Sequence, residues 1–251
     1  MTQKIIAVVN QKGGVGKTTT TINVAAQLAS SGKSVLLVDL DPQGNATSGL
    51  GIPKDQTVTM YEIMCHGAKL PTAVLETNVA QLSVAPSNTN LAGAEIELVE
   101  RDKREFVLQE VLQMADYDYI IIDCPPSLGL LTINALTAAT SVLMPVQAEY
   151  YALEGLSQLL NTVQAVKHST NPNLELLGVV LTMYDKRTSL SEQVRDEVKK
   201  FFGDNLFKTV IPRNIRLAEA PSYGRTIFEH DKWSKGARAY KALTKEIINR
   251  S

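Results

Sequence analysis

Residues Gln11–Thr19 read QKGGVGKTT, and this stretch decides the fold of the chain. It follows the apolar run Ile5–Val9, which is typical of a buried strand, and leads into the helical pattern Lys17–Ser31. A strand, a glycine-rich loop and a helix in this order form a phosphate-binding loop. The glycines let backbone N–H groups turn toward phosphate oxygens, and the helix N-terminus attracts anions. The sequence therefore predicts that the chain binds a nucleoside triphosphate.

The residues of this loop have separate expected roles. Lys17 is expected to bring a positive charge to the β- and γ-phosphates, and the Thr18 hydroxyl is expected to ligate Mg²⁺. The whole segment is expected to surround the phosphates, through Lys12, Gly13, Gly14, Val15, Gly16, Lys17, Thr18 and Thr19.

The loop departs from the standard pattern G-x-x-x-x-G-K-[ST], which requires glycine where this chain has Gln11. It also carries a second lysine, Lys12, beside the paired glycines. A loop lysine can be a solvated surface charge. In this spacing we expect Lys12 to reach phosphate, either in its own subunit or in a facing one, and to neutralise transition-state charge as an arginine finger does.

Apolar runs alternate with helical patterns along the chain. The predicted strands are Ile5–Val9, Ser34–Asp39, Gln81–Ala85, Tyr119–Asp123, Ser141–Val146, Leu176–Thr182 and Thr209–Ile211. The predicted helices are Lys17–Ser31, Asn90–Val99, Lys103–Ala115, Leu130–Ala138, Glu154–His168, Ser189–Phe202 and Lys235–Arg250. Near-continuous apolar strands separated by helices predict a doubly wound α/β fold, with a mostly parallel sheet covered on both faces, in a single domain over residues 1–251.

Acidic residues end two of the predicted strands, at the edge of the sheet where ligands bind. Asp41 follows the second strand in a polar turn and is a candidate for orienting a water toward the γ-phosphate, or else a turn residue before Pro42. Asp39 is expected to order that loop or the shell of the metal. Asp123 ends a strand of four hydrophobic residues, as in a Walker B strand, and is expected to bind Mg²⁺ directly or, as we favour, through a water of its coordination shell.

The composition is that of an ordinary soluble α/β protein, with 251 residues, 44% hydrophobic and 20% charged. We expect a cytoplasmic protein, because no signal pattern and no run of 18 apolar residues occurs. The cysteines, Cys65 and Cys124, form no metal or disulfide pattern. Residues 186–251 carry 15 basic and 8 acidic residues, for a net charge of +7, whereas residues 1–185 have a net charge of −8. This basic region could contact a phosphate backbone or anionic lipid, or consist of solvated helix faces.

The motifs together resemble those of the ParA/Soj partitioning ATPases, within the wider ParA/MinD group of P-loop NTPases. The deviant Walker A, switch I and Walker B elements correspond to Lys12–Thr19, Asp39–Asn45 and Asp123–Ser127. The resemblance continues through Leu91–Leu98, Glu149–Gly155 and Ile211–Ser222, covers the whole chain and points to the chromosomal Soj type. Because the sequence begins almost at its first predicted strand, we expect no N-terminal helix-turn-helix domain of the kind found in the larger plasmid relatives.

The resemblance implies a function and places roles on residues. It implies slow ATP hydrolysis with Mg²⁺, stimulated by a ParB/Spo0J-type partner, with Lys12 crossing the interface of an ATP-bound homodimer and Asp41 supporting hydrolysis. It implies non-specific binding of double-stranded DNA on the nucleoid through Arg187 and Arg216. Relatives act in origin segregation and in control of replication initiation, so a replication initiator is a further implied partner. The adenine is implied to lie near Met183, Pro212 and Asn214.

Three other functions remain to be compared with this one. A MinD-like membrane ATPase needs a C-terminal amphipathic anchor, and the apolar stripe of Lys235–Arg250 is too thin for one, so we expect that helix to dock on its own domain and expect no membrane partner. An iron–sulfur reductase needs two suitably placed cysteines, and Cys124 lies inside the Walker B segment. A small-molecule kinase or synthetase on the same fold would need a substrate pocket for which the sequence names no residues.

Overall fold

The computed structural model describes residues 3–149 and 152–250, and the side chains of residues 3–149 and 156–250. In the segment Glu149–Gly155, one of those that carry the resemblance, residues 150 and 151 and the side chains of residues 152–155 therefore lie outside the described residues. The strands are β1 (Lys4–Val8), β2 (Val35–Asp39), β3 (Leu75–Glu76), β4 (Leu82–Ala85), β5 (Tyr119–Asp123), β6 (Ser141–Gln147) and β7 (Glu175–Thr182). The α-helices are α1 (Lys17–Ser30), α2 (Asn45–Gly49), α3 (Met60–His66), α4 (Ala94–Glu97), α5 (Val107–Leu112), α6 (Leu130–Ala138), α7 (Ala152–Ser169), α8 (Ser189–Phe202), α9 (Ile215–Glu219), α10 (Ile227–Asp231) and α11 (Lys235–Arg250).

The described strands form one sheet in the order β3-β4-β2-β5-β1-β6-β7. Every pairing is parallel except that of the two-residue edge strand β3 with β4. The predicted doubly wound, mostly parallel sheet is therefore confirmed. In this order β5 lies between β1 and β2, and β1 lies between β5 and β6. The loop after β1 therefore lies at a switch point of the sheet, which is where ligands bind in such folds.

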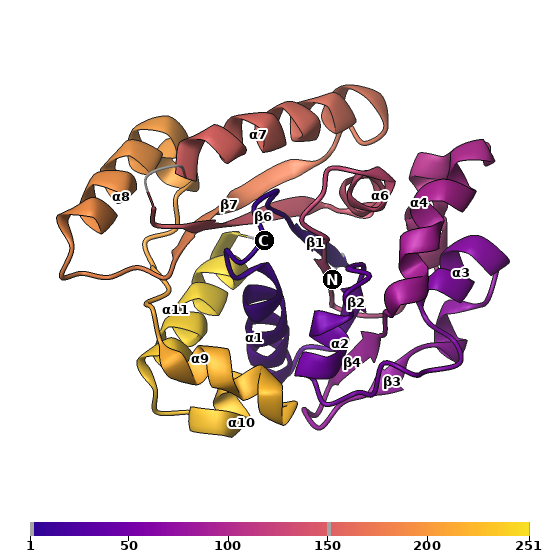
Figure 1. Ribbon diagram of the computed structural model, residues 1–251, viewed down its shortest axis with the longest axis horizontal. Coiled ribbons are helices and arrows are strands. Elements are labelled where there is room, and N and C mark those ends of the chain that lie inside the picture. Colours follow the sequence, from indigo (N-terminus) through magenta and orange to yellow (C-terminus); the bar gives the residue numbers. More distant parts are fainter. Residues whose placement is uncertain (1–2, 150–151, 251) are drawn as a thin grey trace.

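Helices cover both faces of the sheet because its central strands are apolar on both sides (Figure 1). Ile120 and Ile122 of β5 pack in one core cluster, beneath α5, α6, α7 and α8. Tyr119 and Ile121 point to the opposite cluster, beneath α1 and α11. Helix α11 packs on α1 through Tyr240, Leu243 and Ile247, each at most 1% exposed, which confirms that this predicted stripe docks on its own domain.

Several predicted elements differ in the structure. Thr209–Ile211 is not a regular strand, although the Ile211 N–H donates to the Leu181 carbonyl of β7 at 2.8 Å. The pairing is interrupted because the N–H groups of Lys208 and Thr209 are bound by the Glu246 carboxylate of α11. The predicted helix Asn90–Val99 is broken into 3₁₀ turns around the short α4. Lys103–Ala115 begins as a 3₁₀ turn, after Lys103 adopts a left-handed φ of 55°, and is α-helical only over α5. The sequence analysis missed β3, α2, α3, α9 and α10, all of them short.

Candidate nucleotide-binding site

Parallel pairing brings the two strand-end carboxylates together beside the glycine-rich loop. Asp39 of β2 is the register partner of Asp123 of β5, and Val8 of β1 is the partner of Asp123 on its other side. Both carboxylates are completely buried. Because the loop begins directly after β1 and α1 begins at Lys17, the sheet holds both carboxylates close to the loop that is expected to bind phosphate.

The loop is fixed at both ends by side chains that the sequence analysis missed. Asn10 donates to the Pro145 carbonyl at 2.7 Å and accepts from the Lys12 N–H at 2.9 Å. Thr182, the last residue of β7, donates to the Val15 carbonyl at 2.7 Å. Gly16 has a left-handed φ of 89° and caps α1, so glycine is required there. The sequence signal for these two residues was their position, because Asn10 follows β1 closely and Thr182 ends β7, and polar residues at strand ends can contact a neighbouring loop.

Lys17 lies inside this site and not on its surface. Its side chain is nearly buried, and its ammonium donates to the Lys12 carbonyl at 3.3 Å. Burial lowers the pKa of Lys17, while the nearby Asp123 and Asp41 carboxylates act in the opposite direction. A poorly hydrated cation held close to the loop backbone is suited to receiving an anion such as a phosphate.

Lys12 takes a different position. Its ammonium pairs with the Glu149 carboxylate at 3.2 Å, and both side chains are about half exposed, at 46% and 45%. Exposed ion pairs of this kind contribute at most about 1 kcal/mol, so Lys12 can leave Glu149 for a stronger anion at small cost. The structure thus separates one buried lysine from one accessible lysine in the same loop.

Asp123 is held by two hydroxyl groups of α1. Thr18 donates to its Oδ2 at 2.7 Å, and Thr21 donates to its Oδ1 at 2.9 Å. Burial, followed by the charge of Asp39, raises the pKa of Asp123 despite these two bonds. A bound divalent cation would offset that repulsion, so the donor set of Thr18, Asp123 and the adjacent Asp39 suits Mg²⁺. Thr21 was not predicted from the sequence, and its position one turn after Lys17 was the only signal.

Asp39 orders the following loop, which agrees with one of its two expected roles. Its Oδ2 accepts bonds from the N–H and hydroxyl of Thr47, at 2.8 and 2.7 Å, and its Oδ1 accepts from the Asp41 N–H at 3.1 Å. Burial raises the pKa of Asp39, and these bonds oppose the shift. Asp39 therefore ties β2 to α2 across residues 40–44, the loop within the switch I element Asp39–Asn45, and we call these five residues the switch I loop.

Asp41 lies within the switch I loop and is 8% exposed. Its Oδ1 accepts the Gln43 N–H at 2.9 Å, the geometry of a turn-stabilising aspartate. Among the described residues, no hydrogen bond engages its Oδ2. The side chain can therefore stabilise the turn through one oxygen and hold a water through the other.

A cavity of about 390 Å³ adjoins the loop and contains all three residues expected near adenine, Met183, Pro212 and Asn214. Gly16 and Thr19 contribute the wall on the side of the loop, and Tyr240 of α11 closes the cavity from another side. We call this the base cavity. Its walls are mainly apolar, which suits a flat aromatic ring.

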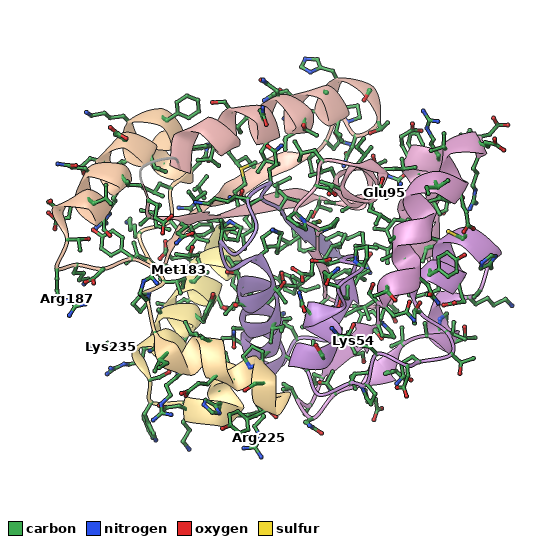
Figure 2. All side chains as sticks on the ribbon, viewed as in Figure 1. Lys54, Glu95, Met183, Arg187, Arg225 and Lys235 are labelled. Atoms are coloured by element: carbon green, nitrogen blue, oxygen red, sulfur yellow. The ribbon has the colours of Figure 1, made fainter. Side chains whose placement is uncertain are left out.

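A second cavity, of about 650 Å³, lies beside the base cavity, and Pro212 and Arg213 line both. We call it the basic groove, and its charged lining consists of Asp185, Lys186, Arg187, Arg213, Lys235 and Arg238. Arg187 and Lys235 lie on the same side of the molecule in Figure 2. Arg187 pairs with Asp185 at 2.7 Å. Arg216 is outside this lining and pairs with Glu219 at 3.0 Å, so the structure does not bring the two expected DNA-binding arginines into one cavity.

Among the described residues, no helix is both long and apolar enough to cross a bilayer. Cys124 is buried and Cys65 is partly buried, and both are free thiols. Burial raises the pKa of each thiol, to about 11 for Cys65. Within residues 3–149 and 152–250, no group of three or more His, Cys, Asp or Glu side chains could hold a metal by itself.

Comparisons with known proteins show the family of the chain. A family model described as an AAA domain matches residues 3–176. The chain is 59% identical to the sporulation initiation inhibitor protein Soj of Bacillus subtilis, over 97% of this chain and 98% of that protein. It is 53% identical to the chromosome partitioning protein ParA of Myxococcus xanthus, over 98% of this chain and 88% of that protein.

A solved structure of cobyrinic acid a,c-diamide synthase from Mycobacterium smegmatis, with bound ATP analog and magnesium, matches this fold with a TM-score of 0.87. It is 39% identical and covers 99% of this chain and 95% of that chain. The nucleotide type and metal in that neighbour are the ones that the sequence predicts here. The identities to Soj and ParA are higher and extend over nearly the full length. The chain therefore belongs to the AAA-domain family of this model and, within it, to the ParA/Soj group of chromosome-partitioning ATPases.

Proposed function

We propose that this chain is an ATP-dependent dimerising switch that binds double-stranded DNA without sequence preference and hydrolyses ATP to drive chromosome segregation. The partner that stimulates hydrolysis is a protein of the ParB/Spo0J type, and a replication initiator is a second partner. In this proposal the protein works in the cytoplasm, on the nucleoid, as a single ATPase domain.

The observation that carries the proposal is the pair of lysines in one loop. Lys17 is buried and suited to the phosphates of its own subunit, whereas the Lys12 side chain is half exposed and its ammonium pairs with Glu149. An accessible cation at the edge of a phosphate site is suited to the γ-phosphate of a facing subunit. Two copies would then share their nucleotides, and the dimer would depend on ATP.

In this proposal, different residues of the site bind the phosphates, the adenine, the attacking water and the metal. Lys17 and the loop N–H groups from Gly13 to Thr19 hold the phosphates, while the base cavity receives adenine. Asp41 orients the attacking water through its second carboxylate oxygen. Thr18 and Asp123, with the weaker candidate Asp39, would hold Mg²⁺, which supplies neutralisation of charge on the phosphate oxygens.

Thr21 provides a first test of the metal site. We expect Thr21→Val to raise the Mg²⁺ concentration needed for half-maximal binding of a fluorescent ATP analogue about 10-fold. Without the Thr21 hydroxyl, the buried Asp123 carboxylate is harder to ionise, and metal binding requires the ionised form. Thr137→Val is the matched control, because Thr137 is equally buried but bonds to Thr170 instead. Equal Mg²⁺ dependence of the two variants would remove Thr21 from the metal site.

Salt dependence tests the DNA-binding part of the proposal. If each subunit neutralises about three phosphates, the ATP dimer should bind unrelated duplexes with a slope of log K against log [salt] of about −5. Arg187→Ala and Arg216→Ala should each make that slope shallower by about 2, since each removes two contacts per dimer. Arg104→Ala, which removes an arginine paired with Glu105, should leave the slope unchanged. Fluorescence anisotropy with ATP, with ADP and without nucleotide provides the measurement, and equal binding in all three states would contradict the switch.

A small-molecule synthetase is the second candidate, because the solved neighbour at 39% identity is named as a diamide synthase. Such an enzyme would release phosphate only when an acceptor acid is present, and DNA would have no effect. Phosphate release measured with duplex DNA, and separately with carboxylic acids of the class that the neighbour's name implies, distinguishes the two candidates.

A further inference from the structure

Two glycines far apart in the sequence, Gly51 and Gly224, touch through their backbones. Both have left-handed φ values, 79° and 61°. A Cβ atom on Gly224 would lie 2.6 Å from the Cα atom of Gly51, and one on Gly51 would lie 3.0 Å from the Gly224 carbonyl. No flexible side chain lies between the two backbones to absorb a movement. A displacement of one segment must therefore displace the other.

Gly51 belongs to the segment that leaves the nucleotide site. It follows α2, and its N–H donates to the Ser48 carbonyl at 3.0 Å. Helix α2 begins after Gly44, at the end of the switch I loop, and Thr47 in this helix holds the buried Asp39. A change in the loop that contains Asp41 is thus transmitted to α2 and to Gly51.

Gly224 belongs to the segment that carries Arg216. Helix α9 continues directly into a 3₁₀ turn, Ala220–Tyr223, that ends at Gly224. The Tyr223 ring stacks on the His230 ring, with centroids 5.2 Å apart. His230 Nε2 lies 3.5 Å from Glu219 Oε2, and the same oxygen accepts from Arg216 at 3.0 Å. A continuous series of contacts therefore joins Gly224 to the Arg216 guanidinium.

The same C-terminal segment also rests on α1, the helix of the phosphate-binding loop. A Cβ atom on Gly49, the last residue of α2, would lie 2.6 Å from Ile22 Cδ1 of α1 and 3.7 Å from Pro221 Cβ. The Ile227 N–H donates to Asn23 Oδ1 of α1 at 2.8 Å. Figure 1 shows α2 beside α1 and near the chain that carries α9 and α10. The turn before α10 is thus braced by both nucleotide-site helices.

We propose that the contact of Gly51 with Gly224 positions Arg216 according to the state of the switch I loop. The two glycines are positioning residues: they transmit a displacement of α2 to α9 and so couple the nucleotide to DNA affinity within one subunit. This inference rests on the proposed function for the role of Arg216, and it adds a route of regulation to dimer formation.

The first test disturbs the contact between Gly51 and Gly224 by a substitution outside the nucleotide-binding site. We expect Gly224→Ala to bind ATP and to dimerise as the unsubstituted chain does, but to lose about 10-fold or more of the ratio of DNA affinity with ATP to that with ADP. Gly67→Ala is the matched control, because Gly67 has a φ of 71° and no atom within 4 Å of its Cβ position. It introduces the same backbone strain without the contact. An unchanged ratio in Gly224→Ala would overturn the proposal.

Hydrogen exchange of the full chain separates this inference from the DNA proposal. With Mg²⁺-ATP against Mg²⁺-ADP, amides of residues 215–224 should change their protection in the unsubstituted chain and in Gly67→Ala, but not in Gly224→Ala. If this exchange pattern is observed but the protein does not bind DNA, the coupling between the switch I loop and residues 215–224 would be retained and the DNA-binding proposal would be refuted. A nucleotide-dependent change that persists in Gly224→Ala would refute the link even if DNA binds.

A second variant covers the case in which Gly224→Ala does not fold. Tyr223 is 65% exposed, so Tyr223→Ala should fold, yet it removes the ring stacked on His230. We expect a smaller reduction in the affinity ratio than in Gly224→Ala. The His230 ring, which contacts Glu219 beside Arg216, would lose the Tyr223 ring that stacks on it. A ratio equal to that of the unsubstituted chain would overturn the route through His230.

Discussion

Lys12→Ala is expected to abolish ATP-dependent dimerisation and, with it, ATP-dependent binding to DNA. If Lys12 crosses the interface, each dimer contains two hydrogen bonds from a charged ammonium to phosphate, each contributing about 1.5–3 kcal/mol. Loss of both should raise the dimer dissociation constant at least about 100-fold. Size-exclusion chromatography with a non-hydrolysable ATP analogue measures this directly.

The geometry of Lys12 suggests two comparisons for that experiment. Glu149→Gln removes the partner that holds Lys12 in the present conformation but keeps the lysine, so dimerisation should occur at an equal or lower ATP concentration. Lys69→Ala removes an exposed lysine far along the chain from the loop and should behave as the unsubstituted protein. Nucleotide affinity of the Lys12→Ala monomer should fall little, because the buried Lys17 remains. An ATP dimer that persists in Lys12→Ala would contradict the cross-subunit role.

The parts of the fold that could be predicted are those specified by local pattern. The six main strands have continuous apolar runs, and the phosphate-binding loop has a fixed order of glycine, lysine and threonine, so both were predicted close to their observed places. Parallel pairing then brings Asp39 beside Asp123, as expected for carboxylates at strand ends. These features depend on residues that are close in sequence or on a general rule of α/β sheets.

The parts that could not be predicted depend on contacts distant in sequence. The sequence at Thr209–Ile211 suggests a strand, and the Ile211 N–H does pair with β7, but Glu246 of α11 binds the N–H groups of Lys208 and Thr209 and interrupts the pairing. Helix α6 was predicted with its observed bounds, but the contact at its first residue was not: the helix has no capping side chain of its own, and Glu95 accepts the Leu130 N–H at 2.8 Å. Helices α2, α9 and α10 have five residues each, too short to form without tertiary packing. The periodicity of apolar residues does not reveal these contacts between segments that are distant in sequence.

Two hydroxyl groups that support the nucleotide-binding site, those of Thr21 and Thr182, could not be predicted from the sequence either. Thr21 and Thr182 follow no motif that the sequence analysis used, although they bond to Asp123 and to the Val15 carbonyl. A threonine in a helix or at a strand end is common and becomes informative only when its partner is known. The residues that we expect to contact nucleotide were chosen from sequence motifs and remain predictions, whereas the residues that hold them in place required the structure.

Asp41→Ala is expected to stop turnover while leaving ATP-dependent dimerisation in place. Positioned general-base and water-orienting groups contribute about 10²–10⁴-fold to rate, so phosphate release should fall about 100-fold or more. If hydrolysis returns the dimer to monomers, as proposed, the variant should remain on DNA long after excess competitor DNA is added. Phosphate release and DNA dissociation should therefore slow together, with ATP affinity changed only a few-fold.

Asp41→Asn separates the two roles that the structure allows for this side chain. Asparagine keeps an oxygen that can accept the Gln43 N–H, which Asp41 Oδ1 now accepts at 2.9 Å, so the turn should be preserved. It removes the negative charge and the second carboxylate oxygen, so it cannot take a proton from water. We expect Asp41→Asn to be as slow as Asp41→Ala. Turnover within about two-fold of the unsubstituted chain would mean that Asp41 serves the turn alone, and the water would then have to be oriented by another group of the switch I loop.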